Sequence, residues 1–99
     1  MKLQFGNLTL VHDSRFIFGP KGSQELSEKE YEILWLLVQA QGEIVSKEDV
    51  VSHLYEDSPP SSNTIESFLV KIRKKMKSIR TSVQLVTVSE NGYMLLWDG

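Results

Sequence analysis

The chain has 99 residues, enough for one domain with a single small core, and 40% of them are hydrophobic. It contains no cysteine, which excludes disulfides and thiolate metal sites and agrees with a cytoplasmic location. The net charge is −2, and no hydrophobic run is long enough to span a bilayer, so we expect no membrane contact by this segment.

Residues 1–26 favour short β-strands separated by turns. Glycine, asparagine, aspartate and proline cluster between segments of β-prone side chains. These segments are residues 3–5, 8–11, 15–18 and 24–26. We therefore expect a four-stranded antiparallel sheet at the N-terminus.

A capping box predicts the start of the first helix. Ser27 can accept a hydrogen bond from the amide of Glu30, whose carboxylate can reach back to the Ser27 amide. We expect this helix to reach about Ala40 and a left-handed Gly42 to end it. Its inward stripe is hydrophobic and comprises Tyr31, Ile33, Leu34, Trp35, Leu37 and Val38.

A second, shorter helix follows a short strand expected at residues 43–45. Ser46 and Asp49 form a second capping box, here with aspartate, and the helix should end near Tyr55. Two prolines then make residues 56–61 a loop.

The segment from about residue 62 to 79 predicts the most informative helix. At 3.6 residues per turn its hydrophobic side chains share one face. They are Ile65, Phe68, Leu69, Ile72, Met76 and Ile79. The opposite face carries Asn63, Ser67, Val70, Lys71 and Lys74. A helix held by aliphatic side chains with polar groups outward suits a DNA major groove, although a solvated surface helix has the same pattern.

The charge is distributed unevenly around this helix. Residues 1–58 contain five basic and ten acidic side chains, whereas residues 59–80 contain one acidic side chain, Glu66, and six basic ones. The six are Lys71, Arg73, Lys74, Lys75, Lys77 and Arg80. A basic segment on an acidic body can orient a protein on a polyanion.

The C-terminal part predicts a β-hairpin. Residues 83–88 and 92–97 favour strands, and Asn91 with Gly92 between them is the strongest short-range hairpin signal. The chain is thus expected to be an α+β domain with an N-terminal sheet (1–26), a three-helix core (27–80) and a terminal hairpin (83–97).

Four fragments in this order resemble the C-terminal effector domain of OmpR/PhoB-type bacterial response regulators, a winged helix-turn-helix. The fragments are the leucine-rich pattern of residues 26–37, the turn of residues 42–50, the helix segments 63–66 and 72–76, and the hairpin segments 86–88 and 92–93. The resemblance covers almost the whole chain.

The resemblance implies a sequence-specific DNA-binding domain of a bacterial transcriptional regulator, the output domain of a two-component system. Its third helix would enter the major groove, and the hairpin would be a wing near the minor groove. The residues placed over bases would be Asn63, Ser67, Val70, Lys71 and Lys74. Those placed at phosphates would be Lys47, Tyr55, Thr64, Arg73 and Lys77. The wing residues would be Thr87, Ser89, Glu90 and Asn91.

The resemblance also implies partners beyond double-stranded DNA. Such domains bind direct repeats as head-to-tail pairs, and a receiver domain usually precedes them in a longer chain. One loop resembles a segment that touches RNA polymerase in some members; it comprises Glu56, Asp57, Ser58, Pro59, Pro60 and Ser61.

The chain departs from the family pattern at four positions. Val70 stands where many members have a basic residue, and valine can contact a thymine methyl group but cannot hydrogen-bond a guanine. Phe68 replaces a frequent histidine. In the wing, Ser89 replaces a common arginine and Glu90 a glycine, so a carboxylate would face phosphates unless it points away.

Several alternatives remain open at the level of sequence. The domain could be a winged helix that binds proteins, which its acidic first half, Glu90 and Val70 would suit. It could also be an excised part of a longer regulator, a stand-alone regulator, or the cytosolic part of a membrane-anchored one. The two histidines, His12 and His53, lack the ligand spacing of a metal site, and no pattern predicts an enzyme or a cofactor.

Overall fold

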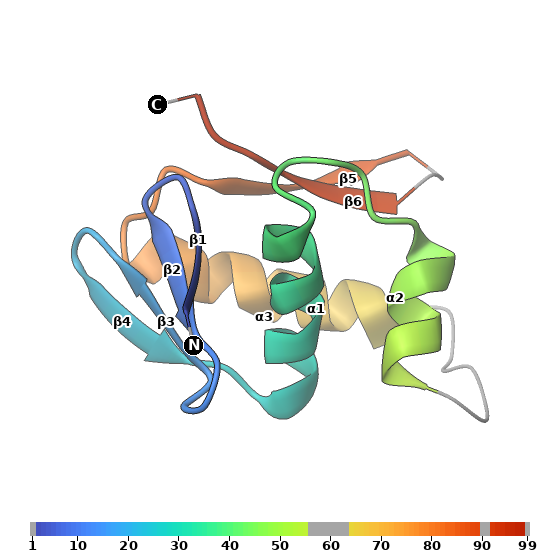
Figure 1. Cartoon of the computed structure of the whole chain (residues 1–99), viewed down its shortest axis with the longest axis horizontal. Helices are drawn as coiled ribbons and strands as arrows, with labels where there is room; N and C mark the ends of the chain where they lie inside the picture. Colours follow the sequence, from blue (N-terminus) through green and yellow to red (C-terminus); the bar gives the residue numbers. More distant parts are fainter. Residues whose placement is uncertain (1, 56–63, 90–91, 99) are drawn as a thin grey trace.

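The computed structural model describes residues 2–55, 64–89 and 92–98, and it has an α+β architecture (Figure 1). The N-terminal part contains four strands, β1 (Lys2–Phe5), β2 (Leu8–Val11), β3 (Phe16–Gly19) and β4 (Gly22–Glu25). Three helices follow, α1 (Glu28–Gln39), α2 (Lys47–Leu54) and α3 (Thr64–Ser78), and then two strands, β5 (Gln84–Val88) and β6 (Gly92–Leu96). The predicted fold class is confirmed.

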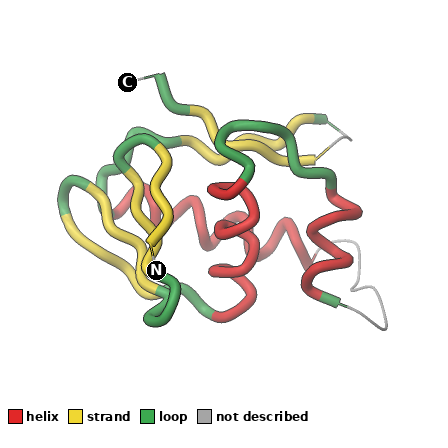
Figure 2. The backbone as a smooth tube through the Cα atoms, in the orientation of Figure 1, coloured by secondary structure: helices red, strands yellow, loops and turns green. Residues whose placement is uncertain are grey.

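The helices connect two separate sheets. The four-stranded sheet lies at one end of the molecule and α2 at the other, while α3 runs between them behind α1 (Figure 1). The β5–β6 hairpin lies along the top of the same view, above α1 and α3 (Figure 2). Among the described residues, no helix combines the length and hydrophobicity needed to cross a membrane.

The N-terminal sheet is the expected antiparallel meander. Its strand order is β1-β2-β3-β4, and Leu10 of β2 pairs with Ile17 of β3. Leu8, Leu10 and Ile17 are fully buried, because alternate residues of each strand face the helices. The sheet therefore covers one end of the core.

Helix α1 begins as predicted but ends differently. Ser27 Oγ accepts from the Glu30 amide at 3.3 Å, and Glu30 Oε1 accepts from the Ser27 amide at 3.0 Å, which confirms the capping box. The first left-handed residue after the helix is Gln41 (φ 50°), and Gly42 (φ 92°) only follows it. Gln41 adopts this conformation because its side-chain amide donates to Val38 O at the helix end, at 2.7 Å.

The segment before α2 is less regular than predicted. In place of a strand at residues 43–45, only Val45 makes a β-bridge, with Tyr93 of β6. Ser46 Oγ caps α2 by accepting from the Asp49 amide at 3.0 Å, which is one half of the expected box. Gly92 makes this bridge possible, because a Cβ there would overlap Val45 O and its own φ is 142°.

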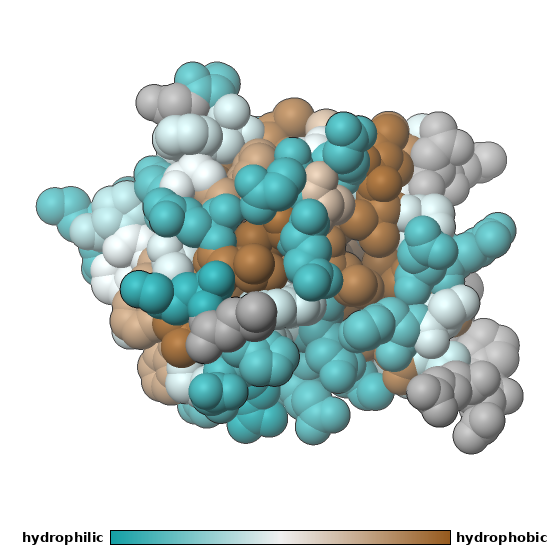
Figure 3. All heavy atoms as spheres, in the orientation of Figure 1, coloured by the Kyte–Doolittle hydropathy of each residue, from teal (hydrophilic) through white to brown (hydrophobic). Residues whose placement is uncertain are grey.

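The hydrophobic face predicted for α3 forms the centre of the core. Ile65, Leu69, Ile72, Met76 and Ile79 are buried, and Phe68 is half-buried against the same cluster. They pack with buried side chains of α1, of which Ile33, Leu34, Leu37 and Val38 are fully buried. On the face drawn in Figure 3, hydrophobic atoms gather towards the centre and polar atoms surround them. Burial of one side of α3 fixes which side reaches solvent.

Candidate nucleic-acid interface

The outward side of α3 presents an exposed strip of three polar residues and one valine. Ser67, Val70, Lys71 and Lys74 are all exposed, and 54% of Val70 is accessible. At 3.6 residues per turn these four positions span an arc of roughly 100° on the helix. The structure therefore brings together the predicted base-reading residues that it describes, and Asn63 lies outside the described residues.

Two of the six basic side chains around α3 are used inside the domain. Lys75 Nζ lies 2.9 Å from Glu30 Oε1 and donates to Glu25 O at 3.0 Å. Arg73 Nε donates to Leu85 O, and its Nη2 donates to Thr87 Oγ1, both at 3.0 Å. These contacts tie α3 to α1 and β4 through Lys75, and to β5 through Arg73.

The other four basic side chains face solvent. Lys71, Lys74, Lys77 and Arg80 are exposed, and the described residues offer none of them a side-chain partner. They extend from the middle of α3 to the residue that follows its end. This part of the helix can attract an anionic polymer, since its charge is not neutralised by the body of the domain.

A polar network joins α2, α3 and the hairpin near the start of α3. Lys47 Nζ and the Tyr93 hydroxyl each lie 3.3 Å from Glu66 Oε1. Burial alone would raise the pKa of Glu66, but hydrogen bonds from the backbone, Lys47 and Tyr93 lower it below 4.5. Burial, together with the nearby Glu66 carboxylate, raises the pKa of Tyr93 to about 12. Glu66 is thus an ionised acceptor for both neighbours.

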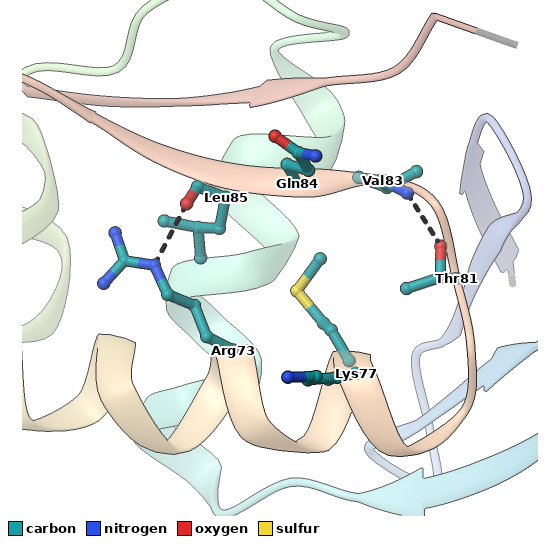
Figure 4. A pocket seen from close by; sticks show the side chains of 7 residues that line it. Arg73, Lys77, Thr81, Val83, Gln84 and Leu85 are labelled. Atoms are coloured by element: carbon teal, nitrogen blue, oxygen red, sulfur yellow. Dashed lines mark hydrogen bonds between the residues drawn. The ribbon is translucent and has the colours of Figure 1, made fainter.

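The remaining predicted phosphate contacts lie at the borders of the exposed strip. The Lys29 ammonium sits 4.8 Å from the centre of the Tyr55 ring, just after α2. Thr64 is half-buried as the first residue of α3. Lys77 lies beside Arg73 in an open notch of about 390 Å³ between α3 and β5 (Figure 4). Of Tyr55, Thr64 and Lys77, only Lys77, on α3, is exposed.

The described part of the hairpin includes two predicted wing residues. Thr87 is exposed on β5, where it accepts from Arg73, and Ser89 is exposed with φ 49° at the start of the turn. Glu90 and Asn91 lie outside the described residues, as does the predicted polymerase loop of residues 56–61.

Sequence reasoning did not foresee the internal roles of Lys75, Glu66 and Tyr93. Their partners come from segments 19 to 50 residues away, so spacing along one helix gives no signal for them. In the part of the chain that the structure describes, no three histidine or acidic side chains meet as a metal site would require.

Comparisons with known proteins agree on one family. A family model described as "Transcriptional regulatory protein, C terminal" matches residues 21–95. The C-terminal domain of the nisin resistance regulator NsrR, a solved structure, is 31% identical, with 96% of each chain covered and a TM-score of 0.80. The transcriptional regulatory protein DltR of Streptococcus agalactiae is 27% identical over 95% of this chain and 42% of DltR.

A more distant structure supports the fold. The Klebsiella pneumoniae RstA DNA-binding domain, solved in complex with the RstA box, is 20% identical, with 94% of each chain covered and a TM-score of 0.75. The chain spans about two fifths of the length of the curated relatives that it matches.

Proposed function

Because the chain belongs to the family of C-terminal domains of transcriptional regulatory proteins, we propose that it binds double-stranded DNA sequence-specifically and regulates transcription in a bacterium. The family match agrees with the OmpR/PhoB-type winged helix-turn-helix that the sequence resembles. The observation that carries the proposal is the arrangement of α3. One side of this helix is hydrophobic and buried, and the other is exposed and carries basic side chains with no acidic partner among the described residues.

The strip supports a specific set of base contacts. Ser67, Lys71 and Lys74 can hydrogen-bond base edges, and Val70 can contact a thymine methyl group. Lysine donates to guanine O6 and N7, so a site read by this face should combine guanines with a thymine opposite Val70. We include Asn63 in the set from its position in the sequence.

Phosphate contacts would come from the borders of the strip. Lys77 is exposed in the last turn of α3, Thr64 is the first residue of that helix, and Tyr55 follows the end of α2. Lys47 is paired with Glu66, but both side chains are about half exposed, so exchange of this partner for a phosphate costs little. Arg73, the fifth predicted residue, is directed towards β5.

Further partners follow from the family. DltR and SaeR are more than twice as long as this chain, so a receiver domain in a parent protein is part of the proposal. Head-to-tail pairs on direct repeats, a wing near the minor groove, and contact of residues 56–61 with RNA polymerase are proposed with it. A DNA-binding regulator of this kind would act in the cytoplasm.

A selection of bound duplexes from a random pool tests sequence specificity directly. The selected duplex should then bind the wild-type domain more tightly than a scrambled duplex, with affinity that falls as salt rises. The variant Lys71→Gln/Lys74→Gln should lose most of this preference. Its matched control, Lys2→Gln/Lys21→Gln, changes net charge equally on the exposed N-terminal sheet and should bind as the wild type does.

Two results would contradict the proposal. If no sequence is enriched and retention on random duplex does not change with salt, the domain does not bind DNA through its basic strip. Equal losses in both double variants would show that net charge matters and that the α3 strip does not.

A further inference from the structure

Arg73 lies at the flank of α3 that faces the hairpin. Its side chain is half-buried and rises from the helix to β5, where Nε donates to Leu85 O (Figure 4). The Nη2 group donates to Thr87 Oγ1, two residues further along the same strand. The planar guanidinium therefore contacts one strand at two points, which an ammonium group could not do with the same geometry.

The acceptors explain why an arginine is useful at this place. Among the described residues β5 pairs only with β6, so its other edge has no neighbouring strand, whereas the outer edge of β6 meets Val45. Backbone carbonyls on such an edge need a donor from elsewhere. Arg73 supplies one to Leu85, and it thereby attaches the edge of β5 to the recognition helix.

A second link holds the other strand of the hairpin. The Tyr93 hydroxyl of β6 lies 3.3 Å from Glu66 Oε1, and Glu66 stands seven residues before Arg73 on α3. Seven residues are about two helical turns, or roughly 10 Å along the axis. These two links add to the Val45–Tyr93 bridge and to the burial of Leu85 and Leu95 in holding the hairpin, and Arg73 is the link on the β5 edge.

We propose that Arg73 is a positioning residue that fixes the wing against α3, and that this role, more than contact with phosphate, determines its effect on DNA binding. Nε and one Nη2 donor of Arg73 are turned towards β5, so a phosphate contact through Nε would require it to release Leu85 O. Lys77, in the same notch, has no side-chain partner among the described residues and is the phosphate ligand of this flank. The inference rests on the proposed DNA binding for its consequence, but the link itself can be measured without DNA.

Amide hydrogen exchange in the free domain tests the link. Arg73→Gln should lower protection of the β5 and β6 amides about tenfold while α1 keeps its protection. Thr87→Val, which removes only the Nη2 acceptor and keeps the side-chain shape, should give a smaller loss at the same amides. Unchanged protection of the hairpin in both variants would overturn the proposal. If Arg73→Gln lowers amide protection throughout the domain, the protection of the β5 and β6 amides in Thr87→Val decides whether the link exists.

A salt titration on the selected duplex separates positioning from phosphate contact. Lys77→Gln should reduce the slope of log affinity against log salt by about 0.9, the value for one lost phosphate contact. Arg73→Gln should weaken binding about fivefold to tenfold, and Arg73→Gln/Thr87→Val should bind no more weakly than Arg73→Gln, because both changes break one link.

The opposite pattern would refute the positioning role. It consists of a slope loss of about 0.9 for Arg73→Gln, an unchanged slope for Thr87→Val, and additive effects in the double variant. Failure of the wild-type domain to bind any duplex would refute the proposed function instead, while the exchange result would still decide whether Arg73 holds the hairpin.

Discussion

Lys75 and Lys74 are neighbours on α3, but Lys75 is paired inside the domain whereas Lys74 is exposed. Lys75 Nζ lies 2.9 Å from Glu30 Oε1, and Glu30 is almost fully buried, with 4% of its side chain exposed. The variant Lys75→Met keeps the aliphatic part of the side chain and removes the charge. Glu30 would then retain the hydrogen bond from the Ser27 amide, but it would lose its only cationic partner among the described residues.

The expected loss of stability in Lys75→Met follows from the burial of the Lys75–Glu30 pair. Loss of one partner from a buried ion pair costs about 3–5 kcal/mol. Because 32% of the Lys75 side chain is exposed, water can reach the site, and we expect a loss at or below the lower end of that range, about 2–3 kcal/mol. For a domain of this size each kcal/mol lowers Tm by about 4–8 °C, so the expected decrease is about 10–20 °C.

Thermal and urea unfolding of two variants measure this difference. Lys74→Met changes the same type of side chain one residue earlier, where it is exposed, and should alter stability by less than about 0.5 kcal/mol. DNA affinity should show the reverse order, with a loss for Lys74→Met and none for folded Lys75→Met. If both variants unfold within a few degrees of each other, the buried pair does not stabilise the domain as argued.

Four further outcomes are expected. Lys71→Ala should weaken specific binding by about 1–3 kcal/mol in a footprint titration if it reads a base; an unchanged affinity would remove it from the base-reading set. Val70→Ala should abolish the difference between a duplex with thymine and one with uracil at the contacted position, and a wild-type domain that does not distinguish them would exclude the methyl contact. Leu34→Ala, at a fully buried site, should cost about 2–5 kcal/mol, which a Tm near that of the wild type would contradict. Burial opposes ionisation of Glu30, but its bonds to Ser27 and Lys75 hold its pKa below 4.5. The unfolded state therefore binds the proton more readily than the folded state. The stability that ionised Glu30 contributes is present above about pH 4.5 and is lost as the pH falls through its folded pKa. Acid unfolding should show a smaller loss of stability in Lys75→Met than in the wild type, and equal losses would contradict this reasoning.

The parts of the fold that depend on local patterns could be predicted from the sequence. The hydrophobic period of α3 identified Ile65, Leu69 and Ile72 as buried, because a helix can bury only one side against α1. The Ser27–Glu30 capping box was predicted because both of its hydrogen bonds join residues three apart. The exposed strip of Ser67, Val70, Lys71 and Lys74 followed from the same periodicity.

The parts that depend on distant contacts could not be predicted. Val45 pairs with Tyr93 across 48 residues, so the sequence suggested a strand where the structure has a single bridge. At the end of α1 the general preference for glycine pointed to Gly42, but Gln41 takes the left-handed position because its own side chain bonds to Val38 O. The bonds of Arg73 to Leu85 O and Thr87 Oγ1 were not predicted either, because their acceptors lie 12 and 14 residues away.

The division of charge on α3 changes what its basic composition means for DNA binding. Arg73 bonds to β5, and Lys75 pairs with Glu30 of α1 and bonds to Glu25 of β4, so both side chains are directed towards the body of the domain. Of the four exposed basic side chains around α3, Lys71, Lys74 and Lys77 lie on the helix with Ser67 and Val70, and Arg80 lies beyond its end. In the proposed function, attraction to phosphate and recognition of sequence would thus be combined on one part of α3, because Lys75 and Arg73, which would have widened the basic surface, hold the fold together.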